Sequence, residues 1–240
     1  MGTAAAKARI TDPARIAAVP AGDVSHNLNG QKLGRKGQAT RERILTAAND
    51  LLTEADDLSI SLSAVARQAS LGMTSLYNYF ADLTELLLAL LGPVMFEAGE
   101  KGGYIDLISE YWPDDELEDR CKSFIEAYFE FWARHSRILH LRNNMADQYD
   151  ERMLAARVRS AQPVIWRLRQ QMCLEGDEPT AAASQMASVL MTGIERAVTV
   201  ATDPKIPEMI EREFGPRNTK VIDPLTRLLV MAIRDCRNGG

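Results

Sequence analysis

The spacing of the apolar residues constrains the fold more than any other feature of this sequence. From residue 40 onward it follows a helical period, with Ile44, Ala48 and Leu51 on one face of a helix of 3.6 residues per turn. No segment bounded by turn residues alternates between apolar and polar residues, as a half-buried strand would. The sequence therefore predicts an all-α protein.

Three short helices are expected near the front of the chain, followed by a fourth. Ser61 and Asp82 are suited to cap the second and the fourth, because their side-chain oxygens accept backbone N–H groups of a first helical turn. Gly72 marks the turn between the second and third helices, and Gly92-Pro93 is expected to end or kink the fourth. Helices this short with connections this tight are typical of a helix-turn-helix unit.

The remainder of the chain is expected to be helical throughout. Pro113 is followed by acidic residues, which favour a helix start because they lie at the positive end of the helix dipole. Asp223-Pro224 pairs an N-cap residue with a proline in the first turn and is expected to open the last helix. Further helices are expected over 136–146, 149–174 with an interruption at Pro163, and 180–201.

The charge is unevenly distributed along the chain. The formal net charge of −5 by itself argues mildly against a nucleic-acid partner. Residues 1–45, however, hold eight Lys or Arg and three acidic residues, whereas residues 46–100 hold one Arg and eight acidic residues. Residues 1–37 also carry several Gly and Pro and sustain no helical period. We therefore predict a flexible basic N-terminal arm at 1–37, ahead of an acidic body.

Cysteine usage and hydropathy bear on the compartment. Three cysteines far apart, with no CxxC pair, support neither a disulfide framework nor a zinc site, and a reducing compartment is expected. No segment resembles a signal-peptide core, and the longest apolar run, 86–91, is far shorter than the about 18 residues that cross a bilayer. A cytoplasmic protein without a membrane partner is the expectation.

The third short helix has an unusual solvent side. It offers hydroxyls, an amide and two phenols, and it carries no acidic residue. Such groups bond to phosphate oxygens and base edges, whereas an acidic side chain would be repelled by the phosphate backbone. The residues concerned are Thr74, Ser75, Tyr77, Asn78 and Tyr79.

Three segments together resemble the TetR family of transcriptional repressors. They are TRERILTAA at 40–48, SLSAVA at 61–66 and SLYNYF at 75–80. Two positions depart from the family pattern: Ser70 stands where the turn usually has Gly, and Leu83 stands where a phosphate-binding Lys usually opens the fourth helix. The resemblance implies a helix-turn-helix DNA-binding domain at 38–91 and an effector-binding and dimerisation domain at 92–240.

The resemblance also implies a partner and a set of contacts. The partner is operator double-stranded DNA, bound by a homodimer and released by a small, largely apolar effector. Two basic residues at the start of the first helix are expected to follow the phosphates. The expected DNA-binding residues are Lys36, Arg41, Ser61, Ser63, Thr74, Ser75, Tyr77, Asn78 and Tyr79.

An effector pocket is expected in the second domain, where aromatic and methionine residues recur at helical spacing. The same spacing is also that of an ordinary core, and this alternative stays open. Tyr128 and His140, together with Arg142, Asn143 and Asn144, are candidates for the polar share of such a pocket. The expected ligand-binding residues are Phe124, Tyr128, Phe131, Trp132, His140, Asn144, Met153 and Trp166.

The last two long helices are apolar on more than one side. A monomer rarely exposes so much apolar surface, so one stripe is expected to face a second subunit, unless other helices of the chain cover it. The expected dimer interface is Met186, Leu190, Ile194, Leu225, Leu229 and Ile233.

An enzyme is not expected from this sequence. His135 and His140 lie five residues apart, which does not align them as a metal pair on one helix face, and no GxSxG, P-loop or GxGxxG is present. The acidic run at 114–119 is interpreted as a solvated helix start rather than as a metal site. Neither a metal nor a cofactor is expected. The alternative to a DNA-binding regulator is a helical small-molecule-binding or scaffold module that does not bind DNA.

Overall fold

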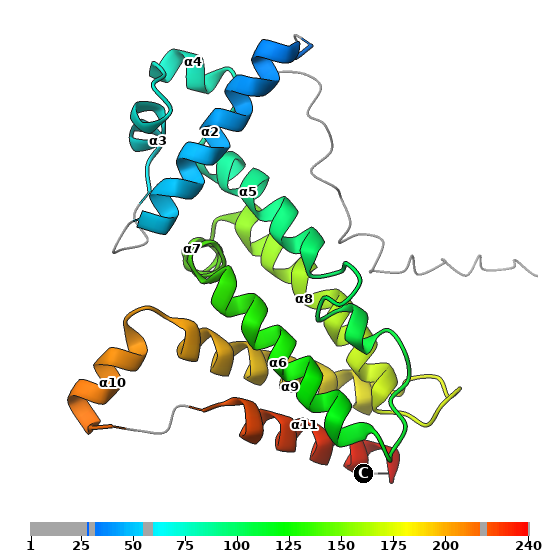
Figure 1. Ribbon diagram of the computed structural model, residues 1–240. Coiled ribbons are helices and arrows are strands. Elements are labelled where there is room, and N and C mark those ends of the chain that lie inside the picture. The colour runs from blue at the N-terminus through cyan, green and yellow to red at the C-terminus, as the bar shows by residue number, and fades with distance from the viewer. Residues whose placement is uncertain (1–27, 29–31, 55–59, 217–219, 240) are drawn as a thin grey trace, which may run out of the picture.

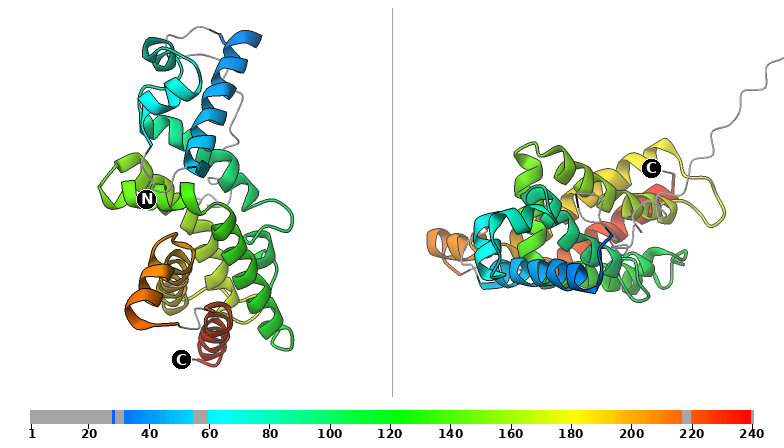
Figure 2. Two further views of the ribbon diagram at one scale, coloured as in Figure 1. Left: turned by 60° about the vertical axis from the view of Figure 1, so that its left-hand side comes forward. Right: turned by 90° about the horizontal axis from the view of Figure 1, so that it is seen from above.

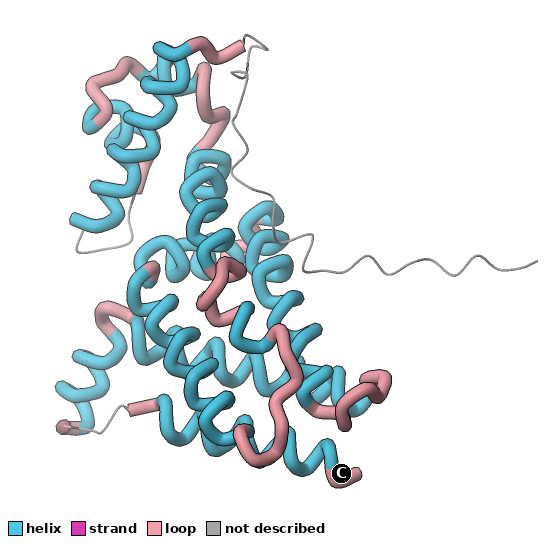
Figure 3. The backbone as a smooth tube through the Cα atoms, turned by 45° about the vertical axis from the view of Figure 1, so that its right-hand side comes forward, coloured by secondary structure: helices cyan, strands magenta, loops and turns pink. Residues whose placement is uncertain are grey.

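The computed structural model describes residues 28, 32–54, 60–216 and 220–239, and within these ranges every regular element is a helix (Figure 3). The all-α prediction is confirmed for this part of the chain. The predicted arm at 1–37 lies almost entirely outside the described residues. The elements are α2 (Arg35–Glu54), α3 (Leu62–Gln68), α4 (Met73–Tyr77), α5 (Leu83–Glu97), a 3-10 turn η1 (Asp106–Ile108), α6 (Leu117–Arg134), α7 (Ser136–Asp147), α8 (Glu151–Gln171), α9 (Ala181–Thr202), α10 (Ile206–Phe214) and α11 (Ile222–Arg237).

Helices α2, α3 and α4 form a small unit at one end of the molecule (Figure 1). Its core is made of Ile44 from α2, Val65 from α3, and Leu76 and Phe80 from α4 and the residues after it, all of them buried. Leu86 from the first turn of α5 joins the same core. Each short helix therefore owes its stability to this shared packing, because isolated helices of this length are unstable in water.

Helices α6 to α9 and α11 form the larger body at the other end (Figure 2). Helix α11 packs along α6, and α8 packs between α7 and α9. Buried aromatic residues fill the interior, among them Trp112 from the loop before α6 and Phe124 from α6 itself. The interior is one continuous apolar cluster that extends from α5 to α11.

Helix α5 connects the two units and belongs to both cores. Leu86 packs in the N-terminal unit, whereas Leu87 and Leu91 pack in the body. The helix was predicted to end or kink at Gly92-Pro93, and it does not end there, because α5 continues through Pro93 to Glu97. A proline inside a helix costs about 3 kcal/mol, and burial of the apolar side chains on both sides of it offsets that cost. The predicted domain boundary at 91 therefore falls within a helix.

The predicted interruption at Pro163 is wrong for the same reason. Helix α8 passes through this residue without a break, and Pro163 itself is buried in the packing of the body. Helix α10 was not expected, and α2 begins at Arg35 rather than at residue 40, before the predicted domain boundary at 38.

The segment before α6 also differs from the prediction. Residues 98–116 form a loop with the short turn η1, and α6 begins at Leu117 rather than at Pro113. Gly103 has a steric role here, because a Cβ at this position would lie 2.6 Å from the Ala98 carbonyl oxygen. The loop is held by Gln171 of α8, whose side chain accepts from the Trp112 N–H (2.9 Å) and donates to the Glu110 carbonyl (2.8 Å). Tertiary packing thus orders a segment that looked helical in sequence.

The residues predicted for the dimer interface are mostly interior to the subunit. Helices α9 and α11 turn this stripe toward α6 and toward each other, so their own chain already covers it. Met186 is the exception, since it is half-buried. The assignment is therefore wrong for the buried residues, which are Leu190, Ile194, Leu225, Leu229 and Ile233.

Candidate functional site

Local interactions define the start of α3 and the turn that follows it. The Ser61 Oγ accepts from the Ala64 N–H (3.2 Å) and therefore caps α3, as the sequence predicts. After α3 the backbone turns through Ser70, which has a φ of +53°, and the Leu71 N–H bonds to the Ala66 carbonyl (2.8 Å). Ser70 thus adopts the left-handed conformation that glycine adopts most readily. Helix α4 then begins after Gly72.

Helix α4 separates its polar and apolar side chains sharply. Leu76 is fully buried, whereas Thr74 and Ser75 are exposed and Tyr77 keeps 48% of its surface accessible. The polar side of this five-residue helix therefore faces solvent at the end of the molecule opposite α11 (Figures 1 and 2).

Two other predicted contact residues follow α4 and are less available. Asn78 and Tyr79 are both half-buried, and Tyr79 packs against the core of the N-terminal unit. The Asn78 carbonyl accepts from the Leu28 N–H (3.0 Å). These two positions are set at the edge of the polar face, whereas Thr74, Ser75 and Tyr77 form its centre.

The segment that forms α3, α4 and the residues next to them carries no acidic side chain. Residues 60–81 contain no Asp or Glu, and their one charged side chain, Arg67, is exposed in the last turn of α3. Ser63 is also exposed, and its Oγ lies 3.1 Å from that of Ser61. A surface of hydroxyls and a guanidinium without a carboxylate is chemically suited to phosphate oxygens.

The two basic residues predicted on α2 differ in exposure. Lys36 is exposed. Arg41 is half-buried, with its guanidinium 5.2 Å from the centre of the Phe80 ring, and this burial lowers its pKa. Arg41 therefore stabilises the N-terminal unit by a cation–π contact, while Lys36 is free of such packing.

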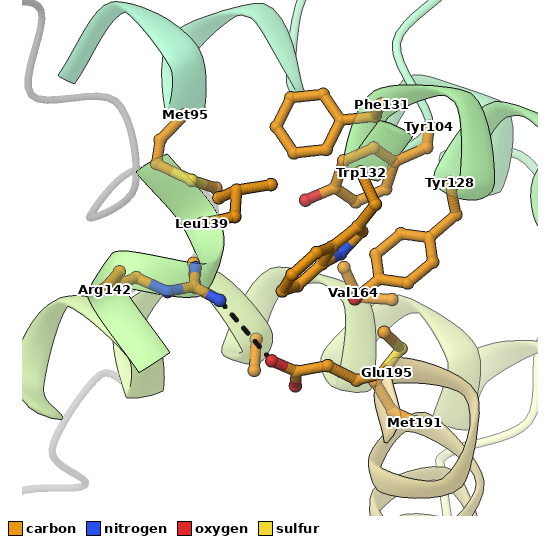
Figure 4. Close-up of a pocket in the computed structure, with 12 residues that line it drawn as sticks. Met95, Tyr104, Tyr128, Phe131, Trp132, Leu139, Arg142, Val164, Met191 and Glu195 are labelled. Carbon is orange, nitrogen blue, oxygen red and sulfur yellow. Dashed lines mark hydrogen bonds and ion pairs between the residues drawn. The ribbon is translucent and has the colours of Figure 1, made fainter. Parts of the chain in front are cut away.

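A cavity lies in the body, between α5, α6, α7, α8 and α9 (Figure 4). Its volume is about 10 Å³, which is the space that one water molecule needs. Four residues that the sequence singled out line it together: Tyr128, Phe131, Trp132 and Arg142. The remaining lining residues are Met95, Tyr104, Leu139, Ser160, Ala161, Val164, Met191 and Glu195.

Arg142 is the central polar group of this cavity. Only 3% of its surface is accessible, and burial lowers its pKa. Its guanidinium donates to the Asn143 Oδ1 (2.9 and 3.1 Å), to the Ser160 Oγ (2.9 Å) and to the Glu195 Oε1 (3.4 Å). It also lies 5.6 Å from the Trp132 ring centre. A charged guanidinium is therefore held in the interior beside a small group of polar side chains.

The structure places the other predicted ligand residues outside the cavity. Phe124 and Met153 are fully buried core residues, and Asn144 is exposed on the surface. Trp166 lies under the guanidinium of Arg169 on α8 (5.6 Å). His140 packs against Trp132 (5.8 Å between ring centres), and burial lowers its pKa.

Sequence reasoning missed two of the polar lining residues. Tyr104 lies in the loop after α5, where no periodic signal exists, and burial raises its pKa above the ordinary value. Glu195 had a detectable signal, because it is a single acidic residue on a predicted helix that is otherwise apolar from Met186 to Ala201 apart from hydroxyls and Arg196. An isolated carboxylate in such a helix indicates a partner of opposite charge.

Comparison with known proteins adds no family assignment. No protein-family model matches the chain, and no curated protein is significantly similar to it. Over the described ranges, none of the helices is both long and apolar enough to cross a bilayer. The same residues contain no cluster of three or more His, Cys, Asp or Glu suited to a metal ion.

Proposed function

We propose that this chain is a DNA-binding transcription regulator, similar to the TetR repressors, that represses by occupying its operator. The observation that carries the proposal is the polar side of α4. Thr74, Ser75 and Tyr77 face solvent there, within a stretch free of carboxylates. Packing in the hydrophobic core explains why Leu76 is apolar. It does not explain why every exposed side chain on this helix is an uncharged hydrogen-bonding group.

The dimensions of α4 are compatible with duplex DNA. An α-helix with its side chains is about 10–12 Å across, and the major groove of B-DNA is about 12 Å wide. In this proposal the exposed hydroxyls of Ser61 and Ser63, which lie 3.1 Å apart at the start of α3, bond the adjacent phosphates. In this proposal Lys36 adds a phosphate contact from α2.

The proposal includes a homodimer, because two copies of α4 must reach successive major grooves about 34 Å apart. A pseudo-palindromic operator follows from that symmetry. The exposed apolar residues of the last two long helices support an interface different from the one predicted. Val189 of α9 is 69% accessible, and Leu228 and Met231 share one face of α11 and are 47% and 61% accessible.

The body supplies the regulatory part of the proposal. A small molecule that enters the cavity beside Arg142 shifts the protein between DNA-competent and incompetent forms, and it acts only through its different affinity for the two. A coupling of about 1–3 kcal/mol corresponds to a roughly 5–150-fold change in operator affinity. No catalytic step is part of this proposal.

A second candidate function is a helical small-molecule-binding module that does not bind DNA. The observation that favours it is the same cavity, since a buried guanidinium beside aromatic rings serves a ligand with or without an operator. The two candidates differ in one respect only, which is whether the polar face of α4 contacts DNA.

Selection from a genomic fragment library with the full chain separates the candidates. The regulator predicts enrichment of specific duplexes, to which Tyr77→Ala and Asn78→Ala bind at least tenfold more weakly while their circular dichroism spectra match that of the parent chain. Tyr149→Ala is the matched control, because Tyr149 is 84% accessible but lies in the body. Failure to enrich any duplex, or equal affinity of all three variants, removes the DNA-binding proposal.

A further inference from the structure

We propose that the cavity between α5, α6, α7, α8 and α9 binds a small organic monocarboxylate, whose carboxylate group is bound by Arg142. The apolar part of the ligand lies among Trp132, Leu139 and Met191, which line the same cavity (Figure 4). The binding itself is independent of DNA. The role of the ligand as an effector rests on the proposed function above.

The first argument is the long ion pair of Arg142. Its hydrogen bonds at 2.9–3.1 Å all go to neutral oxygens, those of Asn143 and Ser160. Its one anionic partner, Glu195, lies at 3.4 Å, whereas ion-paired N–H···O bonds are usually about 2.7–2.9 Å long. A buried guanidinium whose carboxylate partner lies at 3.4 Å can donate shorter hydrogen bonds to the carboxylate of a ligand.

The second argument is the balance of charge around Glu195. Its carboxylate faces two guanidiniums, that of Arg142 at 3.4 Å and that of Arg157 at 4.0 Å. Arg157 also bonds Asp147 (2.8 Å), but the Asp147 side chain is exposed and water screens its charge. Glu195 is therefore shared between the buried guanidinium of Arg142 and the half-buried guanidinium of Arg157. When a ligand carboxylate binds Arg142, Glu195 still has Arg157 as a partner.

The same geometry disfavours a cationic ligand. The rings of Tyr104, Tyr128 and Trp132 lie around the cavity and are attractive to a cation in isolation. A cation placed among them, however, would lie beside the buried guanidinium of Arg142, where like charges repel each other strongly because the dielectric response is low. An anion in the same position is attracted by this guanidinium, although the carboxylate of Glu195, which also lines the cavity, opposes that attraction.

The third argument concerns space. The cavity now has room for about one water molecule, so a ligand requires its walls to move. Met95 and Met191 are unbranched side chains that repack easily. Met95 lies two residues after Pro93, which has no N–H to bond the Ala89 carbonyl, so the last turns of α5 are less firmly held than the rest. Because α5 also begins in the N-terminal unit, a displacement of α5 at the cavity would also move the core against which α4 packs.

The test uses isosteric probes of different charge on the full chain. Binding of phenylacetate, phenylacetamide and phenethylamine is measured by isothermal titration calorimetry, and octanoate and octanamide are measured in the same way. We expect both carboxylates to bind at least tenfold more tightly than their amides and than the amine. Equal or tighter binding of an amide or of the amine, or no binding of either carboxylate, overturns the proposal.

Three variants show whether Arg142 receives the carboxylate. Arg142→Gln is expected to abolish the preference for the carboxylate over the amide. The double variant Arg142→Gln and Glu195→Gln removes both charges of the ion pair and is expected to give the same result. It serves as the test if the single variant fails to fold. Glu195→Gln alone is expected to bind phenylacetate severalfold more tightly, because the competing carboxylate is gone. Weaker binding to Glu195→Gln would show the pair to be purely structural.

These outcomes are distinguishable from failure of the proposed function. Carboxylate binding without any duplex selection leaves this inference standing and removes the regulator. Duplex selection without carboxylate binding does the reverse.

Discussion

The N-terminal unit and the body handle their polar side chains in opposite ways. In the unit of α2 to α4, the core is purely apolar and the uncharged polar groups of α4 face solvent. In the body, charged groups lie inside, and Arg142 and Glu195 occupy the interior next to aromatic rings. Exposed polar groups suit contact with a large partner surface, whereas buried ones suit a ligand small enough to be enclosed. The chain thus separates two kinds of recognition into two regions.

The two regions meet where α5 and α8 begin. Asp82 caps α5 by accepting from the Glu85 N–H (2.8 Å) and also accepts from Arg152 of α8 (2.8 Å). Asp150 caps α8 and accepts from the Thr84 hydroxyl of α5 (2.6 Å). Each aspartate therefore fixes its own helix and bonds the first turn of the other. We call these two reciprocal contacts the cap pair.

The largest effect is expected from adjacent residues on opposite faces of α11. Leu229→Arg buries an unpaired charge, since Leu229 is fully buried, and is expected to lower the free energy of unfolding by about 4 kcal/mol or more. Leu228→Arg lies on the exposed face and is expected to keep the fold but shift sedimentation from dimer to monomer. A Leu228→Arg protein that stays dimeric would remove the proposed interface, and a stable Leu229→Arg protein would contradict the packing of the body.

A core substitution in the small unit tests whether the two regions are separable. Leu76→Ala removes a fully buried side chain and is expected to cost about 3 kcal/mol. We expect hydrogen exchange to speed up in α2 to α4 while α6 and α8 remain protected. If protection falls equally in both regions, they form a single cooperative unit and the comparison fails.

The cap pair is expected to have a smaller effect. Thr84→Val keeps the shape of a buried side chain but removes its hydrogen bond to Asp150, at a cost of about 1 kcal/mol. Thr192→Val is the control, because Thr192 is exposed and bonds only within α9. Urea denaturation curves of both variants measure the difference, and equal midpoints would show that the contact between α5 and α8 adds nothing to stability.

The smallest predicted effect is a dependence of stability on pH. Burial opposes ionisation of Asp82 and Asp150, but hydrogen bonds from Arg152, Thr84 and backbone N–H groups outweigh it, so the pKa of each carboxyl is lowered. A lowered pKa in the folded state stabilises the protein above the ordinary aspartate pKa of 3.8, and this stability is lost as the pH falls below it. Thermal unfolding should show a shallower acid limb in the double variant Asp82→Asn and Asp150→Asn; an identical limb would contradict these shifts.

Local signals in the sequence predicted some helix starts correctly and others wrongly. Helices α2 and α6 begin at Arg35 and Leu117 rather than at the predicted residues, and α11 begins at Ile222, before the Asp223 that was expected to cap it. Ser61, Asp82 and Thr180 each cap a helix that was expected to begin at or just after that residue. Capping is predictable because it depends on one side chain and the next three residues. Pro93 and Pro163 were expected to interrupt helices that in fact continue. Tertiary packing outweighs a local penalty of this size, and no short window of sequence contains that information.

The candidate sites show the same limit. The exposed side of α4 was predicted from its composition, and Thr74, Ser75 and Tyr77 are indeed exposed. For α11, more than one face is apolar in sequence, and which of them is buried depends on how α6 and α9 pack against the helix. In the cavity, Arg142 was recognised as a polar candidate, whereas Tyr104 was missed because a loop carries no periodicity.

The proposal that the polar side of α4 lies against duplex DNA is tested most directly by adding an acidic side chain to it. Thr74→Glu places a carboxylate on an exposed position of α4, and Tyr149→Glu places one on an exposed position of the body. Fluorescence anisotropy on a selected duplex is expected to show at least tenfold weaker binding for Thr74→Glu and unchanged binding for Tyr149→Glu. Equal affinity of the two variants would mean that α4 does not face the nucleic acid.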